Sequence, residues 1–373
     1  MKKSVLIFGI VLLLILIKVI WVLLATSGYG DKNTEKEDIL QRRDWLVENV
    51  CVSPSDLLNK MPRNIGAQFQ GEWALYSCSM LTQALTNIAN IFPETTKESL
   101  EYIDSIISIA MSPELRSFDS ARWGEDPLET LDGDNSHISY ISHVAWMIGN
   151  YKQLGGDSKY DDIYNDLCDA MNRRITQSPN LNLPTYPGEP VYLPDMLVAI
   201  VALHQNGNYN TTVNNWLKYV KAEWSDQETG LLKSFLEEES PVKGSYTSLN
   251  CYYLTFIDED FAREQYYLLK KHFYRDGMLA GIREYTSRSP ILEEDIDAGI
   301  ILFGLSPSAT AFTIGSATFF NDTEKRNALL RTAEIAGHTI KWDGRRHYLL
   351  ADIALVGEAI TLAMRTNYNI SSE

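Results

Sequence analysis

The chain has few of the residue patterns that mark common catalytic centres. Its four cysteines, Cys51, Cys78, Cys168 and Cys251, form no Cys-x-x-Cys pair, and none of its six histidines are spaced as His-x-x-x-His. The sequence also has no Gly-x-Ser-x-Gly turn, no phosphate-binding glycine-rich loop and no dinucleotide-binding glycine pattern. We therefore expect no metal site and no cofactor.

Positive charge is also scarce. The whole chain has 33 basic and 49 acidic residues, and three of the basic residues precede residue 28, which leaves 30 against 49, or −19, for the remainder. A surface of this sign does not attract nucleic acid or an anionic membrane surface. We expect no nucleic-acid partner, and interpret the acidity as a contribution to solubility.

One long apolar run lies at the N-terminus. The segment SVLIFGIVLLLILIKVIWVLLATSG is interrupted only by Lys18, and a membrane-spanning helix needs about 20 apolar residues. Lys2 and Lys3 precede it, which favours a cytoplasmic N-terminus. The run predicts a transmembrane signal-anchor helix over 1–27, in a single-pass protein of the plasma (inner) membrane whose soluble domain is extracytoplasmic, on the periplasmic side. A cleaved signal peptide is the alternative, because residues 25–27, Ala-Thr-Ser, are small.

Export affects the interpretation of the cysteines. In an oxidising compartment, Cys51 and Cys78 are close enough in sequence to form a local disulfide. Alternatively, Cys78, Cys168 and Cys251 lie in apolar helical runs and are small core residues. The sequence leaves both possibilities open, together with the oligomeric state.

A charged linker is expected over 28–37, and beyond it apolar residues recur at helical spacing almost to the end. This pattern predicts an all-α domain over 38–368, in which apolar helices alternate with helices that carry a charged stripe, as inner and outer helices do. The expected inner helices are 71–92, 137–154, 192–205, 247–257, 293–305 and 349–366. The other expected helices are 38–50, 94–111, 158–177, 209–224, 259–274, 309–320 and 323–338.

The expected inner helices begin about 55 residues apart, a repeat that favours a closed ring of six inner and six outer helices. Connections from an outer helix to the next inner helix are long, and the opposite connections are short. The long loops therefore gather on the face where the inner helices begin. Long loops in compact domains commonly carry function, so we expect the site on this face.

One of these loops has an unusual composition. The segment PTYPGEPVYLPD, residues 184–195, brings Tyr186, Glu189, Tyr192 and Asp195 to the start of an apolar helix. Two carboxylates can act as acid and as base or nucleophile in glycoside cleavage, so we predict Glu189 and Asp195 to be catalytic. For Asp195, a charge that stabilises a helix N-terminus is the simpler interpretation. Glu189 has no such helix to cap.

The arrangement resembles the (α/α)6 toroids, a superfamily of six-hairpin glycosidases, lyases and epimerases, over nearly all of 38–366. Within that fold, TYPGEPVYLPDMLVAIVALH and GNYKQLGGDSKY are similar to the linalool dehydratase/isomerase-like group, mainly over 137–205. This second resemblance implies pocket roles for the two tyrosines and two acids of the 184–195 loop. That group is associated with active-site cysteines, whereas Cys168 falls on an expected outer helix.

A second group of candidates comes from the segment 123–140. His137 and Tyr140 share one helix face, and His137 is a candidate general acid or base, with a capping or surface histidine as the alternative. Trp123 offers a flat surface for a sugar ring. The stretch DGDNS, residues 132–136, partly resembles a calcium loop but lacks its glycine and terminal glutamate, and a solvated acidic loop is the simpler interpretation.

Further candidates lie near the starts of the other inner helices. Tyr246, Asp297 and Asp352 are expected to bind substrate, and the two aspartates stand in apolar surroundings where a carboxylate needs a partner or a shifted pKa. Arg283 and Arg345, in neighbouring loops, are candidate partners.

Carboxylates and aromatic rings together suit sugar binding. We therefore expect a membrane-anchored, extracytoplasmic protein that binds a carbohydrate or acts on it as hydrolase, lyase or epimerase, so that its partner is a glycan or other small-molecule ligand. A non-catalytic envelope scaffold or complex subunit is the first alternative, and it predicts a filled centre and an envelope protein partner. A linalool dehydratase/isomerase-like lyase on a small apolar alcohol is the second, and it predicts a cysteine near Glu189.

Overall fold

The structure is a computed structural model that describes residues 2–30, 32–237 and 240–370; in the first helix the side chains of residues 2–8, 11, 12 and 15 are not described. The described residues form fifteen α-helices, four short 3-10 helices and three two-stranded antiparallel sheets. The prediction of a mostly helical domain is confirmed. The three small sheets were not expected.

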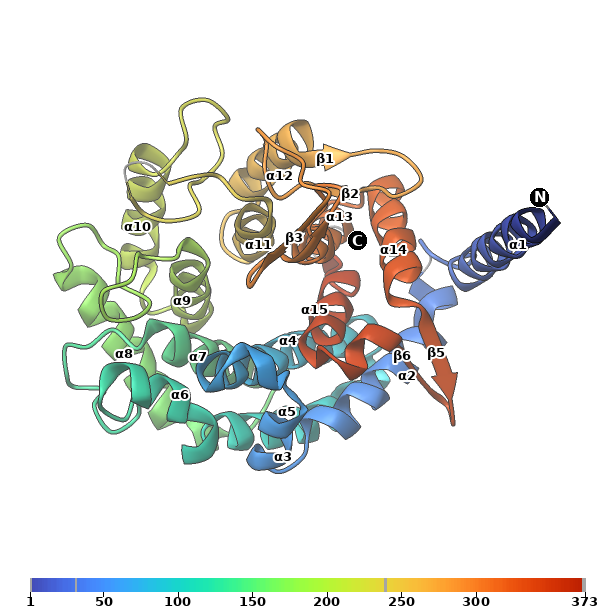
Figure 1. Cartoon of the computed structure of the whole chain (residues 1–373). Helices are drawn as coiled ribbons and strands as arrows, with labels where there is room; N and C mark the ends of the chain where they lie inside the picture. Colours follow the sequence, from blue (N-terminus) through green and yellow to red (C-terminus); the bar gives the residue numbers. More distant parts are fainter. Residues whose placement is uncertain (1, 31, 238–239, 371–373) are drawn as a thin grey trace.

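Six helices form an inner ring around the centre of the molecule (Figure 1). These helices are α4 (Ala67–Ile91), α7 (Ile138–Gln153), α9 (Leu193–Asn206), α11 (Gly244–Leu254), α13 (Pro307–Phe319) and α15 (Leu355–Arg365). Each packs against the next in chain order, and α15 packs back against α4. Their sequences explain this position, because helices that are apolar nearly all round must be buried on all sides. In α9, for example, every residue from Leu193 to Leu203 is buried.

A second set of helices covers the ring from outside. These are α2 (Lys32–Val50), α5 (Thr96–Ala110), α8 (Asp161–Gln177), α10 (Asn210–Glu223), α12 (Glu259–Phe273) and α14 (Thr323–Gly337). From α5 onward, each packs on the inner helix that precedes it, while α2 packs on both α4 and α15. Side-chain caps fix several of the starts, as where Asp258 accepts from the N–H of Phe261 at the start of α12. The remaining helices are α3 (Pro54–Lys60), α6 (Pro113–Trp123), η1 (Arg63–Ile65), η2 (Pro93–Thr95), η3 (Ser158–Tyr160) and η4 (Leu349–Asp352).

The helix expected over 293–305 is wrong, because this segment forms the β3–β4 hairpin, with β3 (Leu292–Asp295) antiparallel to β4 (Gly299–Leu302). Asp295 Oδ1 accepts the N–H groups of Asp297 and Ala298, and Gly299 has a φ of 77°, a conformation that favours glycine. These contacts close a turn where a helix would have continued. The inner helix of this pair is instead α13, which we had expected to be an outer helix.

The connection expected over 339–348 also contains a hairpin, β5 (Thr339–Trp342) with β6 (Arg345–Tyr348). Its turn is Asp343-Gly344, with φ values of 46° and 73°, as the two-residue turns of twisted hairpins require. The last inner helix consequently begins at Leu355, later than expected, after the short η4. A third ladder, β1 (Tyr274–Arg275) with β2 (Gly281–Ile282), connects α12 to the β3–β4 hairpin.

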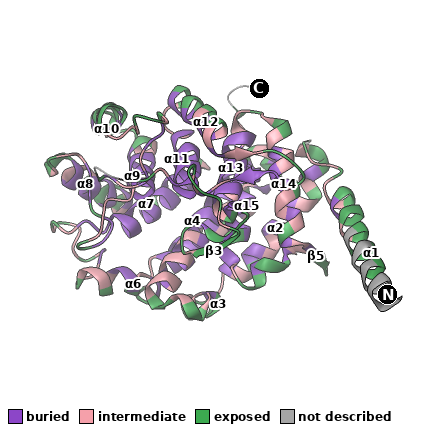
Figure 2. Cartoon of the chain, turned by 45° about the horizontal axis from the view of Figure 1, so that its top comes forward, coloured by how far each residue is buried: buried purple, intermediate pink, exposed green. Residues whose placement is uncertain are grey.

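The predicted membrane-spanning helix falls on α1 (Lys2–Ala25), and several of its side chains lie outside the described residues. Among the residues described, no helix is long and apolar enough to cross a membrane. The helix projects from the ring, and the part of it that is described is mostly exposed (Figure 2). Near its C-terminal end, which lies next to the ring, Trp21 Nε1 donates to Glu334 Oε1 of α14 at 3.1 Å. The linker expected over 28–37 is mostly helical, because α2 already begins at Lys32.

A buried cluster of six charged side chains, here called the ion cluster, ties α2 to α14 and α15. Arg326 Nη1 lies 2.8 Å from Glu35 Oε1, and Arg365 bridges Glu35 and Asp38 at 2.5 Å each. Although burial alone would raise the pKa of Glu35, Arg365 and Arg326 lower it to about 2. The six side chains comprise three acids and three arginines: Glu35, Asp38, Glu358, Arg42, Arg326 and Arg365. The partly exposed Arg346 adds a further contact, with Nη1 at 3.1 Å from Asp38 Oδ1.

We expect Arg365→Met to lower the free energy of unfolding by about 3–5 kcal/mol, because it leaves Glu35 and Asp38 buried without one of their partners. Urea titration followed by circular dichroism measures the change. The matched control is Lys97→Met, which removes the exposed pair of Lys97 with Glu101 and should cost at most about 1 kcal/mol. Equal effects of the two substitutions would show that the ion cluster does not hold the fold together.

Candidate functional site

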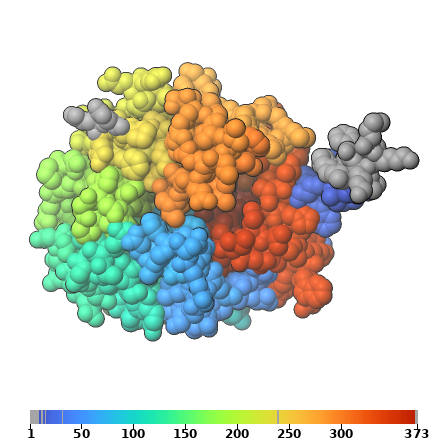
Figure 3. All heavy atoms as spheres, viewed as in Figure 1, coloured from blue at the N-terminus to red at the C-terminus, as the bar shows by residue number. Residues whose placement is uncertain are grey.

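A cavity of about 1020 Å³ opens at the face where the inner helices begin. The first turns of α4, α9, α11, α13 and α15 line it, whereas no described residue of α7 does. In the space-filling view, the surface is hollowed between the segment coloured orange, which includes the β3–β4 hairpin, and the red C-terminal segment (Figure 3). The cavity therefore lies on the face where we expected the site.

Four carboxylates, here called the acid wall, contribute to the lining of this cavity: Glu72, Glu189, Asp195 and Asp297. Glu72 lies in the second turn of α4, Asp195 in the first turn of α9, Glu189 in the loop before α9 and Asp297 at the tip of the β3–β4 hairpin. Aromatic side chains stand among them, and these are Trp73, Tyr76, Tyr186, Tyr192 and Tyr246. The structure thus brings together residues that are far apart in the chain.

Glu72 and Asp195 differ from the other two acids because neither has an ion-pair partner among the described residues. Burial raises the pKa of Glu72 to about 8, and the negative charges of Asp195 and Asp297 add to this rise. Burial also raises the pKa of Asp195 to about 7, although Thr185 Oγ1 donates to its Oδ2 at 2.8 Å and opposes the shift. Both carboxyls therefore hold a proton far more readily than an exposed acid does, and Glu72 holds its proton more readily than Asp195.

Glu189 is held on the wall by basic and aromatic neighbours. Arg122 Nη1 lies 2.5 Å from Glu189 Oε1, and the Tyr192 hydroxyl donates to Glu189 Oε2 at 3.4 Å. The Arg122 guanidinium stacks 4.2 Å from the ring centre of Tyr186. The Pro-Gly turn creates this geometry, because Gly188 takes a φ of 76° and the Glu189 N–H donates to Tyr186 O at 3.2 Å.

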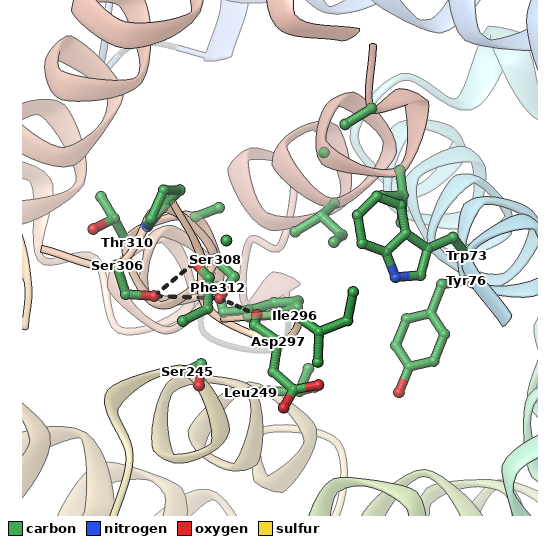
Figure 4. Close-up of a pocket in the computed structure, with 18 of the residues that line it drawn as sticks. Trp73, Tyr76, Ser245, Leu249, Ile296, Asp297, Ser306, Ser308, Thr310 and Phe312 are labelled. Atoms are coloured by element: carbon green, nitrogen blue, oxygen red, sulfur yellow. Dashed lines mark hydrogen bonds between the residues drawn. The ribbon is translucent and has the colours of Figure 1, made fainter. Parts of the chain in front are cut away.

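Asp297 is the only acid of the wall that the β3–β4 hairpin carries. The Tyr246 hydroxyl donates to Asp297 Oδ2 at 2.9 Å, and Lys243 Nζ lies 3.8 Å from the same oxygen. Lys243 Nζ also lies 2.8 Å from Asp295 Oδ2, so a single ammonium fastens the tip of the hairpin to the start of α11. The Asp297 side chain is 43% exposed, yet partial loss of water around it raises its pKa, and Lys243 opposes the rise. Figure 4 shows Ile296 and Asp297 across the cavity from Trp73 and Tyr76 of α4.

Three predicted site residues of the segment 123–140 lie outside the cavity lining. His137 is fully buried, with Nδ1 at 2.5 Å from Asp119 Oδ2 and Nε2 at 3.2 Å from Glu125 Oε1. The ring of Trp123 packs against His137, with centroids 5.3 Å apart. The hydroxyl of the buried Tyr140 donates to a backbone carbonyl at the end of α5 at 3.0 Å. This group faces the outer helices and stabilises the start of α7.

Arg283 and Asp352 also lie outside the cavity lining. Arg283 Nη2 donates to a backbone carbonyl near the end of α12 at 2.6 Å. Asp352 is exposed on η4, and its Oδ1 lies 3.1 Å from His347 Nε2. Arg345, which we had considered as a partner for a buried acid, pairs instead with Glu48 of α2. Of the predicted residues, the cavity lining includes Tyr186, Glu189, Tyr192, Asp195, Tyr246 and Asp297.

The sequence interpretation missed Glu72, Tyr76, Arg122 and Lys243. For Glu72 and Tyr76 a signal existed, because they lie four residues apart at the start of an expected inner helix and therefore share a face. Arg122 and Lys243 gave no such signal. Arg122 reaches the cavity, and Lys243 reaches Asp297 of its lining, through the packing of segments whose positions the sequence pattern did not define.

All four cysteines are free thiols in the structure, and no cysteine lines the cavity among the described residues. Cys78, Cys168 and Cys251 are buried, as the core alternative predicted. Burial raises the pKa of the Cys78 thiol well above its ordinary range. These cysteines are therefore poor nucleophiles.

We expect the protein to lose stability as the pH rises from about 4.5 to about 8, because the folded state keeps a proton on Glu72 that the unfolded chain releases in this window. Glu72→Gln should flatten this part of the curve, since a neutral amide does not titrate. The midpoint of thermal unfolding, measured at half-unit pH intervals, tests the expectation. Glu101→Gln on the exposed surface is the control, and a Glu72→Gln curve that coincides with the control curve would contradict the raised pKa.

Comparison with known proteins adds no assignment to this geometry. No protein-family model matches the chain, and no curated protein sequence matches it either. A proposal of function must therefore come from the cavity and its side chains.

Proposed function

We propose that this protein is an (α/α)6 toroid that binds a carbohydrate in its central cavity and acts on it by acid–base chemistry. The observation that carries the proposal is the pair Glu72 and Asp195, two carboxylates with pKa values raised to about 8 and about 7 in a cavity lined by aromatic rings. Asp195 is buried and Glu72 is partly exposed to the cavity. Acids and bases that work near neutral pH need pKa values in this range. The reaction class is that of a hydrolase, lyase or epimerase.

The assignment to the toroid superfamily draws on helix packing. Six inner helices that contact one another in chain order and close on the first, with outer helices packed on them, are the arrangement that the resemblance implies. Because this architecture accommodates many activities, it supports the placement of the site but does not identify the reaction.

The acid wall suggests different roles for its members. Glu72, which holds its proton more readily, is suited to donate a proton to a leaving oxygen, and Asp195, which loses its proton more readily, is suited to accept one or to attack. Glu189 was our first candidate for catalysis, but Arg122 already compensates its charge, which suits it better to binding sugar hydroxyls. Asp297 is placed similarly beside Lys243. Trp73 and the tyrosines offer faces on which sugar rings pack.

The alternatives are less well supported. A scaffold predicted a filled centre, whereas a cavity of about 1020 Å³ is present. The linalool dehydratase/isomerase-like alternative depended on a cysteine near Glu189, and no cysteine lines the described cavity, so we do not propose it. The membrane anchor and the extracytoplasmic location remain predictions from the apolar N-terminal run, as does an envelope protein partner.

We expect Glu72→Gln and Asp195→Asn each to lower kcat by about 10²- to 10⁴-fold with little change in KM, because each removes a proton-transfer group but keeps the shape of the cavity. In the unsubstituted protein, kcat/KM should fall below about pH 7 as Asp195 is protonated and above about pH 8 as Glu72 ionises. Reducing-end and unsaturated-product assays over a broad panel of glycans measure these quantities.

The matched control for this experiment is Asp352→Asn, which changes an acid outside the cavity and should leave turnover unchanged. Failure of the protein to bind or convert any glycan of the panel would count against the proposed function. Full activity of both cavity variants would instead show that the chemistry lies elsewhere.

A further inference from the structure

Another part of the cavity lining is apolar. It is formed by residues of α13, α14 and α15, here called the apolar half: Ala311, Phe312, Ala333, Ile335, Val356 and Ile360. The hydroxyls of its two neighbouring threonines already have partners. Thr332 Oγ1 donates to Ala280 O at 2.6 Å, and Thr361 Oγ1 donates to Gly357 O at 2.8 Å.

This part of the lining also contains one carboxylate, but both of its oxygens already have partners within the protein. Glu358 is buried, with Oε1 at 2.7 Å from Arg42 Nη1 and Oε2 accepting from the Tyr348 N–H at 2.8 Å. A hydrated glycan placed against the apolar half would lose hydrogen bonds to water without gaining protein partners, which is unfavourable. A sugar therefore explains the acid wall but does not explain the apolar half.

The mouth of the cavity carries large apolar side chains that are open to solvent. Ile296, Ile300, Leu302 and Phe303 of the β3–β4 hairpin region and Leu350 of η4 line the cavity and are nevertheless between 42 and 58% exposed. Each of these side chains exposes apolar surface that an apolar ligand would cover. Exposed patches of this kind mark binding grooves in folded proteins.

We propose that the ligand is an amphiphilic glycoside, with its sugar headgroup on the acid wall and its alkyl chain along the apolar half, leaving between the β3–β4 hairpin and η4. The headgroup part of this inference rests on the proposed function, whereas the chain part rests only on the apolar half and the exposed mouth. Burial of each methylene group of the chain should strengthen binding by up to about fourfold.

The test compares methyl, butyl and hexyl β-D-glucoside, all below the concentrations at which they form micelles, on the purified full chain. Isothermal titration measures the affinities, and quenching of tryptophan fluorescence gives a second readout, because Trp73 lines the cavity. We expect hexyl glucoside to bind about 100-fold more tightly than methyl glucoside. Equal affinities across the series would overturn the proposal.

Two variants locate the alkyl chain. Ala333→Phe and Ala311→Phe each fill part of the apolar half from a different helix, so at least one is expected to fold, which its thermal unfolding midpoint verifies. The folded variant should keep the affinity for methyl glucoside but lose most of the gain from the longer chain. If the gain persists, the chain binds elsewhere, for instance on the exposed α1, and the proposal is wrong.

A hexyl chain with a non-sugar headgroup, hexylphosphocholine, separates this inference from the proposed function. If hexylphosphocholine binds more weakly than hexyl glucoside, the result supports both the proposed function and the inference about the alkyl chain. Equal binding that depends on the apolar half would keep the inference about the chain but contradict the carbohydrate headgroup. If affinity does not depend on chain length but methyl glucoside still binds, the inference about the chain is wrong and the carbohydrate headgroup is kept.

Discussion

The ion cluster is the constraint on which the closed arrangement of helices depends. It lies where α2 crosses α14 and α15, the last outer and inner helices, and α15 in turn packs on α4 at the start of the ring. Taking six charges out of water costs several kcal/mol for each ion, and only close pairing offsets that cost. The ion cluster therefore permits one position of α2 and strongly disfavours a shift by one helical turn. Since α14 and α15 supply much of the apolar half, this constraint also shapes the cavity.

A second constraint acts on the cavity through Lys243. The β3–β4 hairpin packs few of its apolar side chains against the core, since Leu292, Ile300 and Leu302 are exposed. Its tip is held by the pairing of Lys243 with Asp295 and by the hydrogen bond of Tyr246 to Asp297, which both reach the start of α11. The hydroxyls of Ser306 and Ser308, at the start of α13, also donate to the carbonyls of Ala298 and Asp297. The hairpin therefore presents Asp297 to the cavity at a fixed place while leaving its apolar side chains uncovered.

Local sequence patterns predicted most of the helices, but only part of the set of residues that line the cavity. The Pro-Gly turn before α9, the buried character of that helix and the cavity position of Asp195 all depend on residues that are neighbours in sequence. The segment 293–305 was misread because a short apolar run fits a strand as well as a helix, and the turn at Asp295 and Gly299 decided between them. Arg122 and Lys243 could not be predicted, since each meets its acid only after distant segments have packed. His137 was expected in the site from its place at a helix start, but its face of α7 points to Asp119 on α6.

The two parts of the cavity lining depend on each other. Arg122 and Lys243 offset the charges of Glu189 and Asp297, so within the acid wall the largest rises in pKa fall on Glu72 and Asp195, for which burial is the largest cause. Burial in turn reflects how little water the surroundings admit, and the apolar part of the lining keeps water away from these acids. An alkyl chain that displaced the remaining water from the apolar half would raise the pKa values of Glu72 and Asp195 alike, because burial is the largest cause of both shifts. Recognition of an apolar chain would then move the pH range in which Glu72 holds a proton and Asp195 has lost its own to higher pH.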